Sequence, residues 1–378
     1  MLTLFFLFPY ICMETLYELK DITLLPSVKN NGHLTGEIYS VIDKDDNTES
    51  YPIFTAPMEA IVGKETVKSY IDHGIRPILP LTEPINLRLE WCQWIFCAFS
   101  LSEVKQHFLI QDKRSSRTQF HVCIDAGNGH DIEMLDICKK IKQLYSNQVL
   151  VMGGNIGVPE AYVEYCKAGF DYIRVGLNSG SLINRHKYGF HYPMASLLMG
   201  IKNIKTSTAV GLPKLTKIIA DGGIEQPSDI MKAIALGADY VMIGREFARV
   251  LEAQGVVYKK TKVNGKASME EVNPDTLIGM SGFNARNNCL RRQYFGNTCE
   301  ETRAKRAGFQ SVEDWKKTRP SVRVIDSSWE WIDIDCNLAE WTTDFQMCVY
   351  YGFMMTGSKN WLDYQKNVRY GSVLPEVE

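Results

Sequence analysis

The middle of the chain alternates short apolar runs with stretches whose apolar positions recur at helical spacing. Residues 149–152 and 171–175 form apolar runs, and residues 159–168 between them have the spacing of a helix. Clusters rich in glycine follow both runs, at 153–155 and 176–181. The pattern predicts strand, helix and strand, each strand ending in a loop whose backbone N–H groups could bind a phosphate. Because many such loops contain two glycines, this unit alone does not separate a phosphate site from an ordinary connection.

The same order recurs further along the chain. Residues 217–221 and 240–243 form apolar runs followed by glycine, and residues 227–236 between them have helical spacing. Two consecutive units of this kind are typical of a (β/α)₈ TIM barrel, in which loops at the C-terminal ends of the strands form the ligand-binding face. We therefore expect that fold.

The remaining pattern predicts further barrel elements and additions to them. Strands are expected at 51–58, 75–81 and 121–125, helices at 66–72 and 87–106, a hairpin turning at Asn264-Gly265 within 256–268, and closing elements of the barrel at 331–361. Residues 286–315 are expected to form either a mobile flap or a solvated surface helix, and residues 369–378 a tail at a subunit contact. The sequence thus predicts one domain over residues 13–378, with a flap hairpin at about 256–325 and a C-terminal extension.

Composition and charge exclude several classes of protein. Hydrophobic residues make up 45% of the 378 residues and charged residues 23%, which is ordinary for a globular core. A net charge of −2 argues against nucleic-acid binding, and the lack of an 18-residue apolar run argues against a membrane span. The ten cysteines show no CxxC pair, so we expect free thiols in the cytoplasm and no zinc.

The first residues are apolar but lack the basic segment and cleavage site of a signal peptide. We expect that translation naturally starts at Met13 or that residues 1–12 are a loose extension, and we favour a targeting role less.

Several separate motifs resemble one family. They are LKDITLLPSV at 19–28, YPIFTAPME at 51–59, HVCIDAGNGH at 121–130, RVGLNSGSLINRHKYGFHYP at 174–193, IIADGGIEQPSDIMKAIALGADYVMIG at 218–244 and GMS at 279–281. Together they resemble the IMP dehydrogenase/GMP reductase family, in the family's order, from Leu16 to about Gly371. The closest branch is GMP reductase, whose Arg-x-Lys-x-Gly…Tyr-Pro pattern is matched by Arg185, Lys187, Gly189, Tyr192 and Pro193. Many dehydrogenases carry a regulatory insert that has no room here between residues 81 and 121.

The resemblance implies a pocket for a purine nucleoside monophosphate. It places the phosphate on Ser181, Gly222, Gly223 and Gly244, the ribose on Asp221, and the base against Met58, Met280, Ser281 and Gly282. Arg245 replaces the small residue usual after Gly244, and it could either add a charged contact or crowd the site. Taken alone, Asp221 suits a ribose diol because a carboxylate accepts two hydrogen bonds, but it could also only tie down its own loop, and Met58 could simply be core.

The resemblance also implies a nicotinamide cofactor, NADPH or NAD. Asp125 would bind the cofactor ribose, with Ala126, Asn128 and Gly176 nearby, although Asp125 could instead cap the helix beginning near Asp131. Glu252 matches the acidic residue that serves proton transfer in the reductase branch. K⁺ is a further possibility, in the loop containing Asn178 and Gly180, where Asn178 replaces a glycine.

The main departure from the family is at its nucleophile. Ile183 occupies the position of the cysteine whose thiolate attacks C2 of the purine, and the family's threonine is either replaced by Arg185 or deleted. An isoleucine cannot attack, and the sequence does not place Cys123 or Cys166 to substitute for the missing thiolate.

Three functions follow. The first is a GMP reductase-like oxidoreductase that converts GMP to IMP with NADPH, its covalent step in doubt. The second is a non-catalytic purine-nucleotide binder, either a sensor or a partner subunit. The third is an IMP dehydrogenase, whose Arg-Tyr flap lacks a match because Arg292 and Tyr294 are not adjacent. The resemblance also implies a homotetramer.

Overall fold

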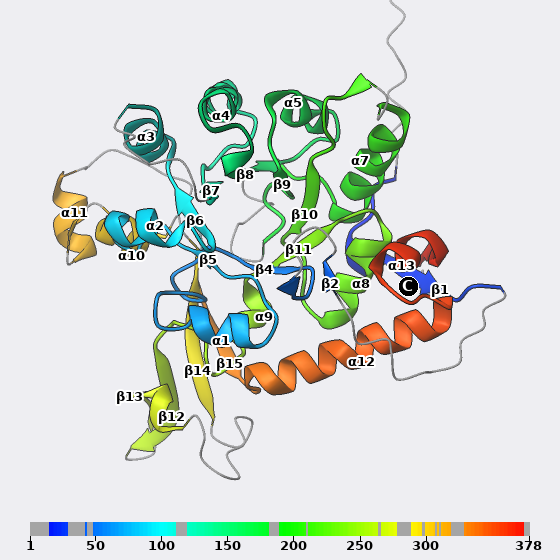
Figure 1. Ribbon diagram of the computed structural model, residues 1–378. Helices are drawn as coiled ribbons and strands as arrows, with labels where there is room; N and C mark the ends of the chain where they lie inside the picture. Colours follow the sequence, from blue (N-terminus) through cyan, green and yellow to red (C-terminus); the bar gives the residue numbers. More distant parts are fainter. Residues whose placement is uncertain are drawn as a thin grey trace, which may run out of the picture.

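The computed structural model describes residues 15–28, 42–43, 48–110, 119–180, 189–208, 211–263, 266–277, 289–296, 299–306, 308–309, 311–318 and 329–373. Its centre is an eight-stranded sheet of parallel neighbours in the order β4-β11-β10-β9-β8-β7-β6-β5. A parallel bridge between Phe54 and Arg76 joins β4 to the segment before β5 and so brings the two edges together. The predicted (β/α)₈ barrel is therefore confirmed (Figure 1).

The barrel strands are short and alternate with helices along the chain. The strands are β4 (Ile53–Thr55), β5 (Ile78–Leu79), β6 (Phe96–Phe99), β7 (Phe120–Ile124), β8 (Val149–Ile156), β9 (Tyr172–Val175), β10 (Lys217–Asp221) and β11 (Tyr240–Ile243). The helices are α1 (Val67–Asp72), α2 (Ile85–Trp91), α3 (Leu101–Val104), α4 (Ile132–Tyr145), α5 (Ala161–Ala168), α7 (Met194–Thr208), α8 (Pro227–Ala235), α9 (Arg245–Ala248), α12 (Leu338–Thr356) and α13 (Trp361–Asn367).

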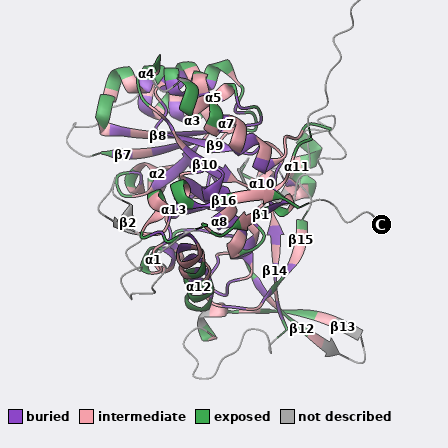
Figure 2. Cartoon of the chain, turned by 90° about the vertical axis from the view of Figure 1, so that its right-hand side faces the viewer, coloured by how far each residue is buried: buried purple, intermediate pink, exposed green. Residues whose placement is uncertain are grey.

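Both faces of the barrel sheet are buried, because its strands carry apolar side chains on alternate sides. On β9, Tyr172 lies in the interior cluster, whereas Ile173 and Val175 belong to the cluster that packs under the helices. The same alternation puts Ile219 inside and Ile218 outside on β10. Figure 2 shows the result, with buried strands at the centre and exposed residues on the outer sides of the helices.

One predicted helix is only partly correct. The helix expected over 87–106 is interrupted by strand β6, which carries Phe96 and Phe99 into the barrel wall. All four residues of this strand are buried, so its apolar run has no period that would separate it from a helix. A second correction concerns residues 153–155. They were expected to end the preceding strand, but β8 continues through them to Ile156.

A four-stranded sheet in the order β13-β12-β14-β15 lies beside the barrel. The expected hairpin is confirmed as β12 (Val257–Val263) and β13 (Lys266–Val272), while its turn at Asn264-Gly265 lies outside the described residues. Residues expected to be a flap or a surface helix contain β14 (Leu290–Phe295), a strand paired with both β12 and β15 (Trp329–Ile334). Two short helices follow β14, α10 (Glu300–Arg306) and α11 (Val312–Thr318).

The C-terminal part differs from its prediction in two ways. The eighth barrel strand is β11, so β15 does not complete the barrel, and α12 serves instead as an outer helix packed against α8. The residues expected to form a tail include β16 (Arg369–Ser372), which pairs antiparallel with β1 (Ile22–Leu25). These four residues therefore belong to the fold, and a subunit contact there stays a prediction.

Two further observations concern the described residues alone. None of their helices combines the length and the apolarity needed to cross a bilayer. Their nine cysteines are all free thiols.

Candidate functional site

A charged layer lies above the hydrophobic interior of the barrel, at the C-terminal ends of the strands. Alternation along the strands places Asp125, Arg174 and Asp221 two residues after the interior residues Cys123, Tyr172 and Ile219. The Nη2 atom of the buried Arg174 lies 3.0 Å from Asp125 Oδ1 and also donates to the carbonyls of Ile124 and Gly154. Because the strands are parallel, these three charges meet at the edge where barrel enzymes bind ligands.

Asp221 on β10 is fixed by a contact from β8, which lies two strands away in the sheet. Asn155 Nδ2 donates to Asp221 Oδ2 at 2.7 Å and to the Gly176 carbonyl at 3.2 Å. Burial raises the pKa of the Asp221 carboxyl, while Arg174 and Asn155 oppose that rise. Asp221 is therefore a partly desolvated acceptor with a defined orientation, which is more than a residue that ties down its own loop.

The loops around Asp221 are glycine-rich because the backbones approach closely. Gly176 has φ of 125°, and a Cβ there would lie 2.4 Å from the Asp221 carbonyl oxygen. A Cβ on Gly244 would lie 2.5 Å from the Tyr294 hydroxyl and 3.4 Å from Met58 Sδ. Gly222 and Gly223 form the turn directly after Asp221, so these predicted phosphate residues border the charged layer.

Tyr294 was not predicted as a residue of this site, but the structure brings it there. It arrives on β14, and its hydroxyl donates to Met58 Sδ at 3.6 Å, next to Gly244. Burial raises its pKa, so the phenol stays neutral and can donate a hydrogen bond. The only local signal was the in-out alternation of β14, and that signal is obscured because Arg292 occupies one of the buried positions.

Arg292 is also buried, and its structural role was not predicted from the sequence. Its guanidinium donates to five backbone carbonyls, those of Gly255, Ala248, Val250, Leu251 and Ala253, at distances of 3.0, 2.9, 2.6, 3.0 and 2.8 Å. We call this arrangement the carbonyl cage. It fixes the loop after α9 to β14.

Glu252 lies on the loop that the carbonyl cage fixes. Its Oε2 accepts the backbone N–H of Leu338 at 2.9 Å, at the first turn of α12. Burial raises the pKa of its carboxyl above the ordinary value. Within the described part of the chain no hydrogen bond joins Glu252 to Asp221, so the structure does not bring these two predicted residues into contact.

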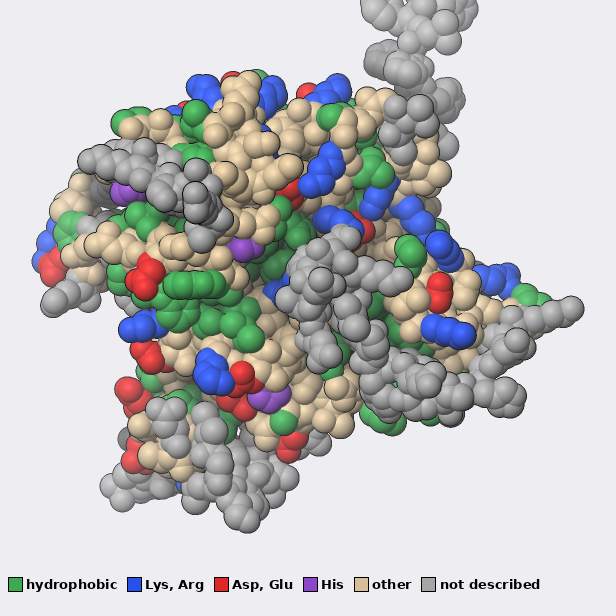
Figure 3. All heavy atoms as spheres, viewed as in Figure 1, with side chains coloured by type: hydrophobic (Ala, Val, Ile, Leu, Met, Phe, Trp, Pro, Cys, Tyr) green, Lys and Arg blue, Asp and Glu red, His purple; other side chains and the backbone are tan. Residues whose placement is uncertain are grey.

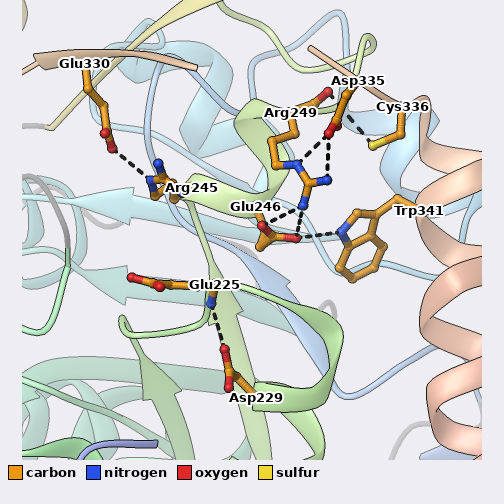
Figure 4. Close-up of polar contacts among 9 residues, drawn as sticks. All are labelled: Glu225, Asp229, Arg245, Glu246, Arg249, Glu330, Asp335, Cys336 and Trp341. Atoms are coloured by element: carbon orange, nitrogen blue, oxygen red, sulfur yellow. Dashed lines mark hydrogen bonds and ion pairs between the residues drawn. The ribbon is translucent and has the colours of Figure 1, made fainter. Parts of the chain in front are cut away.

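The side chain of Arg245 forms an ion pair with the four-stranded sheet. Its Nε lies 3.0 Å from Glu330 Oε1 on β15, as Figure 4 shows. The same view shows Arg249 bound to both Glu246 and Asp335, with the Trp341 indole donating to Glu246. These pairs connect α9 to β15 and α12.

The predicted cofactor and cation residues occupy two neighbouring loops. Asp131, not Asp125, caps α4 by accepting the N–H of Glu133 at 2.9 Å, so the capping alternative for Asp125 is wrong. Asn128 accepts from the backbone of His130 in the same loop, after the half-buried Ala126. In the other loop, Asn178 has φ of 58° and its Nδ2 donates to the Phe190 carbonyl at 2.7 Å, while a Cβ on Gly180 would meet no atom of the described residues within 4 Å.

Six predicted site residues lie outside the described residues. They are Ser181, Ile183, Arg185, Met280, Ser281 and Gly282.

The two thiols considered as substitutes for the missing nucleophile are buried. Cys123 lies inside the barrel below Asp125, and burial raises the pKa of its thiol to about 12. Cys166 lies on the inner side of α5, where its sulfur accepts the N–H of Thr216. Because both sulfur atoms are buried within packed clusters, neither group is suited to attack a bound purine.

Comparisons with known proteins agree with the motifs and the fold. The family model for the IMP dehydrogenase / GMP reductase domain matches residues 116–312. The GMP reductase of Clostridium acetobutylicum is 28% identical over 302 residues, covering 71% of this chain and 88% of that protein. The GMP reductase of Bacillus subtilis is 28% identical over 66% of this chain and 78% of its own length. The inosine-5'-monophosphate dehydrogenase of Chlorobaculum parvum is 38% identical over a shorter region, 35% of this chain and 26% of that protein. The chain therefore belongs to the IMP dehydrogenase/GMP reductase family, with its resemblance strongest to the GMP reductase branch.

Proposed function

We propose that this protein is a GMP reductase-like oxidoreductase that acts on a guanine nucleoside monophosphate without a thiolate nucleophile. The observation that carries the proposal is the charged layer of Asp125, Arg174 and Asp221 at the ligand-binding edge of the barrel, bordered by a glycine turn. Relatives named GMP reductase support the same activity.

The nucleotide would lie across this edge with its phosphate toward β11. Backbone N–H groups of Gly222, Gly223 and Gly244, together with the Tyr294 hydroxyl, are suitable donors to a phosphate. Asp221 would accept hydrogen bonds from the ribose diol, and Met58 would contact the base. Ser181 and the segment from Met280 to Gly282 complete the proposed set.

The cofactor would be NADPH, which when bound supplies a hydride. The carboxyl of Asp125 is suited to the cofactor ribose, because its side chain is 15% exposed at a strand end and is oriented by Arg174. Ala126, Asn128 and Gly176 lie on the same face. A monovalent cation near Asn178 and a homotetrameric assembly stay predictions from the resemblance.

The net reaction adds hydride to C2 of the guanine and breaks the bond from C2 to the exocyclic nitrogen. The departing amine takes up a proton and leaves as ammonia, giving IMP. Glu252 would help deliver that proton, because burial raises its pKa and so keeps the carboxyl protonated to a higher pH than an exposed glutamate. Its contact with α12 means that delivery to the nucleotide would pass through an intervening group such as water.

A second function is favoured by one specific observation. Ile183 cannot form the covalent intermediate of the family, and neither Cys123 nor Cys166 is suited to replace it. A protein with this site could bind a purine nucleotide without turnover, as a sensor or as a partner of an active relative. The dehydrogenase alternative has less support, because Arg292 is held in the carbonyl cage.

The two functions are separated by combining turnover with binding. We expect loss of NADPH absorbance and release of ammonia when the protein is mixed with GMP, and calorimetric binding of GMP that Asp221→Ala clearly weakens. Asp333→Ala, at an exposed position on β15, is the matched control and should bind as the wild type does. Binding without turnover would establish the sensor function, and GMP affinity unchanged by Asp221→Ala would refute the ribose assignment.

A further inference from the structure

Arg245 directly follows Gly244 and begins α9. It places a positive charge next to a proposed phosphate residue, at a position where the family has a small residue. Its side chain is 37% exposed and that of Glu330 is 34% exposed, so this ion pair lies at the rim of the site. Toward the described residues, Arg245 uses only its Nε–H, although a guanidinium carries five N–H donors.

The surroundings of Tyr294 place this pair next to the proposed phosphate site. A Cβ on Gly244 would lie 2.5 Å from the Tyr294 hydroxyl, and Tyr294 pairs with Glu330 across β14 and β15. Asp221 pairs with Met242 on β11, two residues before Gly244. The arginine, the glycine turn and the ribose carboxylate therefore share one small region. An anion bound at Gly244 would lie within electrostatic reach of both members of the ion pair.

We infer that Arg245 is a phosphate-binding residue that makes this site selective for a dianionic phosphate monoester, and that Glu330 is the competing anion that holds it when no phosphate is bound. The inference rests on the proposed function and deepens it. A guanidinium binds phosphate oxygens through two parallel N–H donors, and such charged contacts are about twice as strong as neutral ones. The ion pair is neutral as a whole, so an arriving dianion gains an attractive partner only when Arg245 turns toward it.

The pair can open without detaching β15 from the barrel. Arg249 Nη2 and Nε bind the two carboxylate oxygens of Asp335 at 2.8 and 3.1 Å, just after β15. The ladder between β14 and β15 supplies a further attachment, from Leu290↔Ile334 to Phe295↔Trp329. Since these contacts are independent of Glu330, exchange of Arg245 between Glu330 and a phosphate requires only side-chain rotation.

A purely structural role for Arg245 makes different predictions, which binding measurements can separate. We would titrate GMP and guanosine, which lacks the phosphate, into the wild-type protein and the variants Arg245→Ser, Glu330→Gln and Arg291→Ser. Arg291 is an arginine on β14 whose ion pair with Asp333 lies on the other face of that sheet, so its variant is a matched control.

We expect Arg245→Ser to weaken GMP binding by about 10- to 100-fold, the range for loss of a hydrogen bond to a charged group, and to leave guanosine binding unchanged. Glu330→Gln should strengthen GMP binding several-fold, because it removes a negative charge near the phosphate and frees the arginine. Arg291→Ser should change neither ligand.

Three results would overturn the inference: unchanged GMP affinity in Arg245→Ser, an equal loss for GMP and guanosine, or weaker GMP binding in Glu330→Gln. If the wild type binds no GMP, the proposed function fails, and the same variants are then titrated with inorganic phosphate. Phosphate affinity that depends on Arg245 would still support the inference, whereas absent or unaltered affinity would end it.

Discussion

The carbonyl cage around Arg292 offers a direct test of what joins the four-stranded sheet to the barrel. The perturbation is Arg292→Met, which keeps much of the aliphatic stem and removes the guanidinium. It removes the guanidinium donor from five carbonyls of residues 248–255. The arginine side chain is 0% exposed, so these contacts are buried.

The expected loss of stability is the balance of two opposing effects. A buried acceptor that loses its partner costs about 1–3 kcal/mol. The Val250 carbonyl still accepts the N–H of Ala253 at 3.4 Å, so the other four carbonyls could together cost more than about 4 kcal/mol if nothing relaxed. Against this, burial lowers the pKa of Arg292 to about 10, which shows that its charge is itself costly to bury, and methionine removes that cost. Breaking a buried charged network typically costs about 3–5 kcal/mol, and we place Arg292→Met near the lower end.

The assay is urea-induced unfolding of the wild type and three variants. Arg291→Met is the matched control, since Arg291 is the adjacent residue on β14 but forms a surface pair with Asp333, which is worth about 0–1 kcal/mol. Arg292→Lys should be intermediate, because an ammonium keeps the charge but has only three donors. A loss in Arg292→Met no larger than that in Arg291→Met would refute the claim that the cage stabilises the junction.

Two further predictions concern the charged groups of the site. Arg174→Met should cost about 3–5 kcal/mol of stability, because it removes the buried guanidinium from its ion pair with Asp125, and it should raise the pKa of Asp221 further and weaken GMP binding in calorimetry. Arg174→Lys is its control, and equal GMP affinity in both variants and the wild type would contradict the prediction. For Glu252, burial raises the folded-state pKa above the ordinary 4.5, so the native state holds more protons than the unfolded chain between those two values. The free energy of unfolding should therefore fall as pH rises through that window. Glu252→Gln should remove this fall in unfolding experiments across pH, and an unchanged profile would contradict the prediction.

Local signals in the sequence were enough to predict the barrel. Strand, glycine and helix follow one another twice within about a hundred residues, and each unit depends on neighbours in the chain. Strand β6 was missed for the opposite reason. Its residues Phe96–Phe99 are buried on both sides, so neither alternation nor helical spacing distinguishes the strand from the helices around it.

The charged layer could be predicted only in part, because it forms only when the parallel strands pair in register. Asp125 and Asp221 were found at the ends of apolar runs, but Arg174 lies inside such a run and has no local feature that marks it. Only the register of β9 against its neighbours brings Arg174 to Asp125, 49 residues earlier in the chain. Tyr294 depends on a still longer connection, since β14 carries it from outside the barrel to Met58, 236 residues away.

The energetics of this layer bear on function independently of the missing cysteine. Replacing a whole buried ion pair by apolar residues of similar size is often neutral or stabilising, although removing one partner alone is costly, so the presence of the layer is weak evidence for a purely stabilising role. Burial raises the pKa of Asp221 although Arg174 and Asn155 oppose the rise, so its ionised form is more costly here than in water. A ligand that donates two hydrogen bonds to this carboxylate would relieve that cost. In the proposed function, nucleotide binding and covalent chemistry are therefore separable, because binding would depend on Asp221 and its neighbours whereas the covalent step would need a thiolate.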